Sequence, residues 1–300
     1  MPKKKLLLGA HISAAGGLYK SLERGASIGC TTMQIFTKSN RQWAAKELTV
    51  NEITKFKKAV KQHSIAPIVA HCSYLINIGS PNEQTAAKSI LALKIELQRC
   101  QDLEIPYLVL HPGSHLKAGE DECLARIAKN LDCILNETPG NTMILLETMA
   151  GQGSAVCHIF EHIATIRKLS QNNKRIGVCF DTCHAFVAGY DLRTKNSYEK
   201  TWLTFDKIIG LQNLKVIHVN DSKKELGSRV DRHENIGDGK IGLEGFKLLF
   251  NDKRFFDIPK ILETPKDDLN EDLINMQKIV TLLSDETKNE LEISVAERIN

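Results

Sequence analysis

The segment GVCFDTCHAF, residues 177–186, places two cysteines, an aspartate and a histidine within a few positions of one another. Thiolate, imidazole and carboxylate groups are the side chains that bind zinc and other divalent metals in proteins. The segment therefore predicts a metal site. Which of the four side chains could bind a metal depends on the strands and loops that position them.

A repeated pattern surrounds this segment: a short apolar run, a polar residue, and then an amphipathic stretch. Eight such runs occur, and they lead to His11, Thr37, His71, His111, Glu147, Asp181, His218 and Glu263. The intervals between runs leave room for a loop, a helix and a return, which is typical of βα units. Eight units without a Gly-, Pro- or Ser-rich linker favour an α/β fold with one closed (β/α)8 TIM barrel over an open, doubly wound sheet. We expect the barrel over residues 1–284 and a charged C-terminal tail over residues 285–300.

Composition excludes several classes of protein. The chain has 300 residues, 42% of them hydrophobic, which is enough for a substantial core. No apolar run approaches the ~18 residues of a membrane span. The net charge of +4 permits a nucleic-acid partner without requiring one. Eight scattered cysteines without a CxxC pair favour reduced thiols, so we expect a cytoplasmic protein.

The C-terminal strand ends of such a barrel form one face, and active sites lie there. From the third run to the eighth, every terminal residue is a histidine or a carboxylate. Just past the strand ends, His184 follows Asp181, and Asp231 stands two residues before His233. Imidazoles and carboxylates suit Zn²⁺, Mn²⁺ or iron, and nine such ligands are enough for three sites of three. Three divalent cations facing four carboxylates would leave a positive cavity, suited to the anionic transition state of phosphodiester cleavage.

These residues belong to longer motifs in a fixed order: GAHISAAGG, FTKSNRQW, AHCSYLINIGSP, LHPGSH, ILLETMAGQGS, GVCFDTCHAFVAGYDLRT and HVNDSKKELGSRVDRHENIGDGKIG. With them the chain resembles endonuclease IV, the zinc-dependent apurinic/apyrimidinic endonuclease family of base excision repair, over nearly its whole length. The resemblance implies a DNA repair enzyme with three zinc ions per chain. Its substrate would be double-stranded DNA containing an abasic site, cut on the 5′ side to leave a 3′-hydroxyl and a 5′-deoxyribose phosphate.

The resemblance also implies how the ligands divide. One zinc would be held by His71, His111 and Glu147; a second, sharing Glu147, by Asp181, His218 and Glu263; the third by His184, Asp231 and His233. The predicted catalytic carboxylates are Glu147, Asp181 and Glu263. In the family, the attacking hydroxide arises at the bridged pair and the leaving 3′ oxygen is stabilised at the third zinc. Cys179 and Cys183 are predicted to be small apolar packing residues.

Arg41, Tyr74 and Leu75 match loop residues that the family inserts into the DNA stack to reach the abasic nucleotide. Basic side chains on the same predicted face could neutralise phosphates: Lys38, Lys223, Lys224, Arg229, Arg232 and Lys240. Two departures from the family pattern, Ser39-Asn40 and Cys72, bear on DNA affinity and not on the zinc sites. We expect a monomer that uses no nucleotide cofactor and binds no membrane.

Two short motifs point elsewhere. His158-Ile-Phe-Glu-His162 matches the H-x-x-E-H signature of inverted zinc peptidases, but we expect it on the solvent-facing outer ring of helices. Gly237-Asp-Gly-Lys-Ile-Gly242 matches a dinucleotide-binding fingerprint, but it follows a loop and not a strand, so a turn is the better interpretation.

Two alternative functions remain open at this point. A divalent-metal sugar isomerase or epimerase would account for Glu147, Asp181, His218 and Glu263, but it would not require the third group of ligands. A non-catalytic relative that binds damaged DNA would usually lack a ligand, and none of the nine is missing.

Overall fold

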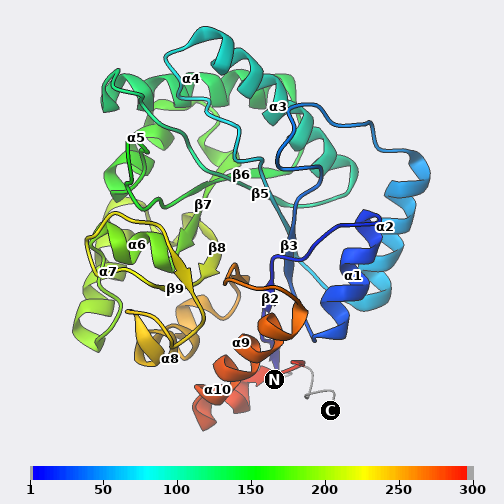
Figure 1. The fold of residues 1–300 in the computed structure, drawn as a ribbon, viewed down its shortest axis with the longest axis vertical. Helices are drawn as coiled ribbons and strands as arrows, with labels where there is room; N and C mark the ends of the chain where they lie inside the picture. Colours follow the sequence, from blue (N-terminus) through cyan, green and yellow to red (C-terminus); the bar gives the residue numbers. More distant parts are fainter. Residues whose placement is uncertain (1–2, 296–300) are drawn as a thin grey trace.

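A barrel of eight parallel strands forms the centre of the protein, and helices surround it (Figure 1). The structure, a computed structural model, describes residues 3–295. The barrel strands are β2 Leu8–Ala10, β3 Met33–Ile35, β4 Ile68–His71, β5 Tyr107–Leu110, β6 Met143–Glu147, β7 Ile176–Asp181, β8 Leu214–Val219 and β11 Lys260–Leu262. From β3 onward each strand pairs with the next along this series, and β11 pairs with β2. An isolated bridge from His11 to Gln34 joins the ends of this paired series. The predicted (β/α)8 barrel is confirmed.

The helices surround the barrel, and most of them pack an apolar side against it. They are α1 Leu18–Ser27, α2 Val50–His63, α3 Glu83–Asp102, α4 Glu120–Glu137, α5 Phe160–Leu169, α6 Thr182–Ala188, α7 Lys195–Ile208, α8 Gly242–Phe250, α9 Leu269–Thr281 and α10 Asp285–Glu290. In α4, apolar side chains recur with helical spacing, and the stripe from Leu124 to Leu135 is buried. Amphipathic helices of this kind leave the strand ends as the accessible part of the barrel.

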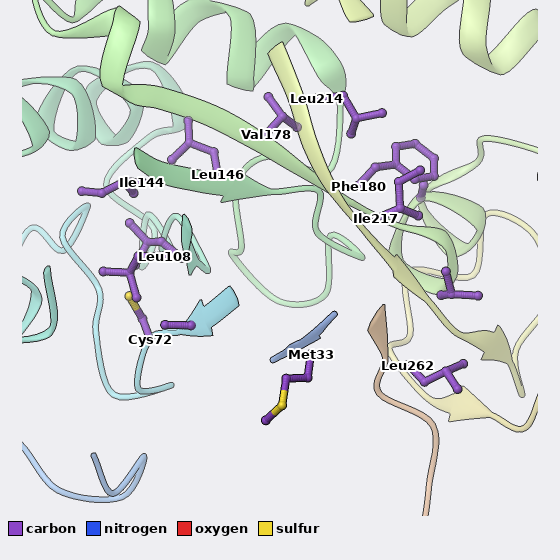
Figure 2. Close-up of a cluster of buried hydrophobic side chains, with 14 of the residues drawn as sticks. Met33, Cys72, Leu108, Ile144, Leu146, Val178, Phe180, Leu214, Ile217 and Leu262 are labelled. Carbon is purple, nitrogen blue, oxygen red and sulfur yellow. The ribbon is translucent and has the colours of Figure 1, made fainter. Parts of the chain in front are cut away.

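The alternation of side chains along each strand separates packing from chemistry. In β7, Val178 and Phe180 point outward into the apolar layer between barrel and helices, which Figure 2 shows together with Leu146 and Leu108. Cys179 points inward and packs with Val69, Val109, Leu145, Val216 and Ile261 in a small cluster that fills the barrel. Asp181 occupies the next inward position, and it therefore faces the C-terminal mouth.

Short elements close the opposite end of the barrel. Strand β1, Lys4–Lys5, pairs in parallel with β12, Leu291–Glu292, and Leu291 is buried. Residues 285–292, in the predicted tail, thus form α10 and β12; residues 296–300 of that tail lie outside the described residues, and the domain boundary at residue 284 stays a prediction. Within residues 3–295, no helix has both the length and the apolar character that crossing a membrane requires.

Candidate metal centre

The barrel brings the nine predicted metal ligands together at its C-terminal mouth. Glu147 and Asp181 end their strands, as does His71, whereas β8 continues one residue past His218. The ligand atoms form three groups, and within each group they lie within 4.8 Å of one another. The groups are His71, His111 and Glu147; Glu147, Asp181, His218 and Glu263; and His184, Asp231 and His233. Strands that run in one direction place their ends on one face, which explains why residues so far apart in the chain converge.

Glu147 connects the first two groups. Its Oε2 atom lies 3.2 Å from Nε2 of His71 and 3.1 Å from Nε2 of His111, whereas Oε1 lies 2.9 Å from Nδ1 of His218. Burial alone would raise the pKa of Glu147, but the nearby imidazoles of His218 and His111 hold it well below its usual value. The side chain is therefore a buried carboxylate with one oxygen facing each of two neighbouring groups of candidate ligands.

Asp181 connects the second group with the third. Its Oδ1 atom accepts a hydrogen bond of 2.8 Å from the backbone N–H of His184 and so caps α6. Its Oδ2 atom accepts from Nδ2 of Asn220 at 2.7 Å and lies 3.9 Å from Nε2 of His233. The cap explains the spacing of the DTCH sequence, because it starts a helix at Asp181 and turns His184 toward the same mouth.

The third group depends on a loop that folds back over the mouth. Strand β9, Asp221–Ser222, pairs antiparallel with β10, His233–Glu234, and the intervening loop carries Asp231. The two oxygens of Asp231 lie 3.2 Å from Nε2 of His184 and 3.3 Å from Nε2 of His233. The carboxylate thus lies between two imidazoles that come from separate elements.

The hydrogen bonds of the histidines fix which ring nitrogen faces each group. Nδ1 of His71 donates to the carbonyl of Cys72, Nδ1 of His184 to that of Thr148, and Nδ1 of His233 to that of Glu263. In the neutral ring, Nε2 then carries a lone pair, and in each case it faces a carboxylate oxygen. Two acceptors at this distance repel unless a proton or a metal cation lies between them.

Two of these nitrogens face the carboxylate of Asp231 at close distance without making a hydrogen bond to it. Nε2 of His184 and Nε2 of His233 are buried and have no hydrogen-bond partner among residues 3–295. Burial opposes charge on His184, but Asp181, Asp231 and Glu147 raise its pKa well above the usual value, so the surroundings favour a positive charge there. Histidines held by backbone carbonyls and facing carboxylates are the donor set of zinc sites, and the nine residues could hold three such ions.

Comparisons with known proteins identify the family. The family model described as xylose isomerase-like TIM barrel matches residues 22–283. A probable endonuclease 4 from Chloroflexus aurantiacus is 49% identical over 277 residues, which is 92% of this chain and 97% of the relative. The crystal structure of endonuclease IV from Thermus thermophilus has a TM-score of 0.82 and 34% identity, covering 94% of this chain and 98% of that one. The chain belongs to the endonuclease IV family.

Sugar-metabolising barrels share the architecture alone. A D-tagatose 3-epimerase-like protein superposes with a TM-score of 0.69 at 18% identity and covers 91% of this chain and 96% of that one. At this identity the likeness shows the fold and carries no information about the reaction. Membership of the endonuclease IV family, in contrast, rests on relatives that match nearly the whole chain.

The residues predicted from the endonuclease IV motifs to enter DNA lie at the rim of the mouth. Tyr74 is 56% exposed and Leu75 is 37% exposed, although both are large and apolar. The ring of Tyr74 lies 5.4 Å from that of His71 and 5.3 Å from that of His111, between ring centroids. Arg41 is exposed in the loop between β3 and α2. The structure thus places Tyr74 directly beside the first group of candidate ligands.

A buried ion pair beneath the rim was not predicted. Nζ of Lys38 lies 3.3 Å from Oε1 of Glu96 in α3, and the two side chains are 4% and 1% exposed. Glu96 also accepts a hydrogen bond of 3.2 Å from the backbone N–H of Ser73, whose hydroxyl donates to the carbonyl of Asn40 at 2.7 Å. Lys38 was expected only as a possible phosphate contact; in the structure its Nζ atom pairs with Glu96 and donates to the carbonyl of Gln42 at 2.6 Å. Glu96 ties together the loops that carry Arg41 and Tyr74.

The peptidase-like motif does not form a zinc site of the inverted peptidase type. Helix α5 begins at Phe160, so His158 precedes it, and both histidines are buried, contrary to the predicted solvent-facing position. His158, His162 and Glu120 do lie close together. However, Nδ1 of His162 accepts the N–H of Cys157 at 3.1 Å, so Nε2 of the neutral ring carries the proton and cannot bind a metal.

The GDGKIG segment is a turn, as predicted, and the structure supplies the reason. The carboxylate of Asp221 accepts hydrogen bonds from the backbone N–H groups of Gly237, Gly239, Ile241 and Gly242. A ring of N–H groups such as this could bind a phosphate, but here the protein's own carboxylate fills it. Sequence reasoning did not predict this role of Asp221. It also missed three residues that form hydrogen bonds with the candidate ligands, namely Gln34, Thr148 and Asn220. A lone polar residue inside an apolar strand, as in MQIF, is the signal that could have revealed Gln34.

Proposed function

We propose that the protein is an apurinic/apyrimidinic endonuclease that hydrolyses the phosphodiester 5′ to an abasic site in double-stranded DNA, using three zinc ions. The products would be a 3′-hydroxyl and a 5′-deoxyribose phosphate. Membership of the endonuclease IV family supports the reaction class. The observation that carries the three-metal proposal is the third group, in which the buried Nε2 atoms of His184 and His233 face the carboxylate of Asp231 without a hydrogen bond to it.

Zinc bound at these groups would supply a water of lowered pKa and positive charge to stabilise the phosphorane-like transition state. The protein's own side chains determine where that charge would lie. Glu147 would contribute to the first and second positions, and Asp181 and Glu263 would contribute to the second. Glu147, Asp181 and His218 are fully buried, so their electrostatic interactions are weakly screened. For these reasons we assign the catalytic role to the carboxylates of Glu147, Asp181 and Glu263.

Recognition of the abasic site is assigned to the rim. An abasic nucleotide must leave the helix to reach a buried centre, and apolar wedges inserted into the stack make this possible. Tyr74 and Leu75 are exposed apolar side chains beside the mouth, which supports this role. Arg41, exposed on the neighbouring loop, would contact the DNA backbone or fill the gap in the stack.

A sugar isomerase or epimerase would leave part of the centre without a role. Such an enzyme could use the group formed by Glu147, Asp181, His218 and Glu263. It would not need His184, Asp231 and His233, whose two buried and unpartnered nitrogens would then be an unexplained cost. The endonuclease accounts for all three groups with one reaction.

Metal analysis and a nicking assay test the proposal. Purified protein should carry close to three zinc equivalents, one for each group, and should nick a duplex with one abasic analogue without added magnesium. Asp231→Asn should lose one equivalent and keep the bridged pair. A single manganese ion, an intact duplex and interconversion of a ketose would favour the isomerase. Binding of the abasic duplex without nicking would favour a non-catalytic relative.

The proposed enzyme acts as a cytoplasmic monomer without a nucleotide cofactor or a membrane partner. All eight cysteines lie in the described part of the chain and are free thiols, and seven of them are buried, which supports a reducing compartment. Sedimentation of the purified protein with and without abasic duplex tests the monomeric state.

A further inference from the structure

Gln34 is a buried polar residue in the wall of the barrel. It lies in β3 between Met33 and Ile35, whose side chains belong to the outer apolar layer, so the side chain of Gln34 points into the barrel. It is fully buried, and its backbone lies at the bridge that joins β3 to the residue after β2. A buried amide requires partners for its oxygen and its NH2 group.

The amide of Gln34 meets three residues at the mouth. Its Oε1 atom lies 2.8 Å from Nε2 of His218, its Nε2 atom donates to Oε1 of Glu263 at 2.6 Å, and the same Nε2 atom lies 2.9 Å from Nδ1 of His11. Only one orientation of the amide satisfies these contacts. The flipped amide would place its oxygen against the carboxylate of Glu263 and its NH2 group against His218.

This orientation decides which nitrogen of His218 faces the metal centre. Because Oε1 of Gln34 is an acceptor, Nε2 of His218 carries a proton, and in the neutral ring the lone pair is on Nδ1. Nδ1 lies 2.9 Å from Glu147 and 3.2 Å from Oε2 of Glu263. His71, His184 and His233 obtain the same control from backbone carbonyls. His218 obtains it from a side chain, so a substitution can remove it.

We propose that Gln34 is a positioning residue for the second metal position, where it fixes the tautomer of His218 and leaves Oε2 of Glu263 free to bind. The inference rests on the proposed function, because it assumes that His218 and Glu263 bind a metal. Partners of this kind behind metal-binding histidines change metal affinity by about 10- to 100-fold when they are replaced. Gln34 binds no metal itself in this assignment.

Two substitutions separate hydrogen bonding from packing. Gln34→Met keeps the volume of the side chain but removes both hydrogen-bonding groups, so Nε2 of His218 loses its acceptor. Gln34→Ala leaves a small polar cavity that a water molecule can occupy, and this water can accept from His218 and donate to Glu263. If Gln34 acts through hydrogen bonds, Gln34→Met should be the more damaging change. If Gln34 only fills space, Gln34→Ala should be the more damaging change.

The measurement is the release of zinc from the loaded protein to a chromophoric chelator, with the equivalents released and their rates recorded. In Gln34→Met one zinc equivalent should bind about 10- to 100-fold more weakly than in wild type, and the remainder should be unchanged. The zinc affinity of Gln34→Ala should lie between those of Gln34→Met and wild type. The NMR signal of the Nε2 proton of His218 should also disappear in Gln34→Met. Gln98→Met, an exposed glutamine in α3, is the control and should match wild type.

Equal release from wild type and Gln34→Met would overturn the inference, as would weaker binding in Gln34→Ala than in Gln34→Met. If Gln34→Met does not fold, Gln34→Ala decides alone, and unchanged release from it would overturn the inference. Wild-type protein that binds no zinc would instead overturn the proposed function, and the role of Gln34 with it.

Discussion

Oε1 of Glu147 lies 2.9 Å from Nδ1 of His218, and both side chains are fully buried. The other oxygen of the same carboxylate faces two further histidines. One negative charge therefore serves two groups of candidate ligands, in a place where water cannot replace it. Loss of that charge should affect both groups at once, whereas loss of a ligand at the edge should affect one.

Glu147→Gln should abolish nicking and lower the zinc content. The amide keeps the shape of the side chain, but its NH2 group cannot bind a cation and it carries no charge. We expect the nicking rate on an abasic duplex to fall at least about a hundredfold. Glu161→Gln, in the exposed part of the peptidase-like motif, is the matched control and should keep full activity and zinc. Full activity of Glu147→Gln would contradict the shared position.

Tyr74→Ala should weaken binding of the abasic duplex and leave the zinc content unchanged. Stacking of an aromatic ring on a base contributes about 1–3 kcal/mol, so we expect about a tenfold higher Kd. Leu203→Ala, which removes an exposed leucine from α7, is the control and should bind as wild type does. Unchanged preference for abasic over intact duplex would remove Tyr74 from recognition.

Glu96→Gln should raise KM for DNA more than it lowers kcat. The substitution removes the charge that pairs with buried Lys38 and weakens the link between the two rim loops. Zinc content should not change, because Glu96 binds none of the candidate ligands. Glu104→Gln, which breaks the exposed pair with Lys57, is the control with an expected effect near zero. An unaltered KM in Glu96→Gln would contradict the positioning role.

Salt dependence separates Lys38 from Arg41. Each phosphate contact contributes about −0.9 to the slope of log K against log salt concentration. Arg41→Gln should make this slope shallower by about 1. Lys38→Gln should weaken DNA binding but leave the slope unchanged. A shallower slope for Lys38→Gln would mean that this side chain does reach a phosphate.

Lys260 makes stability depend on pH at the end of the barrel opposite the metal centre. Burial lowers its pKa to about 7, and its Nζ donates to the carbonyls of Phe255 and Ile258. In the unfolded chain the pKa is about 10.4, so between these values the unfolded state binds more protons, and the free energy of unfolding rises with pH. The slope should be at most about 1.4 kcal/mol per pH unit. Lys260→Met should lack this pH-dependent part of the free energy of unfolding. Urea unfolding midpoints of wild type and variant, measured at pH 7 and pH 9, should therefore differ by an amount that changes with pH. The same difference at both pH values would contradict the prediction.

The sequence predicted the parts of the centre that follow from strand direction. Eight apolar runs located the barrel, and parallel strands then had to carry His71, Glu147 and Asp181 to one face. Spacing could not divide the ligands into groups, because the division depends on distances across the barrel. The family resemblance was needed for that step.

Contacts set by the approach of separate elements were out of reach of sequence reasoning. Lys38 and Glu96 meet because α3 passes beneath two loops, and the sequence around neither residue indicates this contact. His158 precedes α5, and His162 is one of the buried residues of that helix, so the motif does not lie on the exposed side of the helix. Lys38 has its ion-pair partner far away in the chain, whereas the hydrogen-bond partners of His158 and His162 are the nearby residues Ala155 and Cys157.

The alternation along β7 has a consequence for insertions and deletions. Phe180 packs outward, with its ring 4.5 Å from that of Trp202 between ring centroids, while the next residue, Asp181, faces the mouth. One residue gained or lost before this pair would exchange the two sides. The carboxylate would then press against an indole and the phenyl ring would enter the centre, so β7 should tolerate many substitutions of similar size but no change of length.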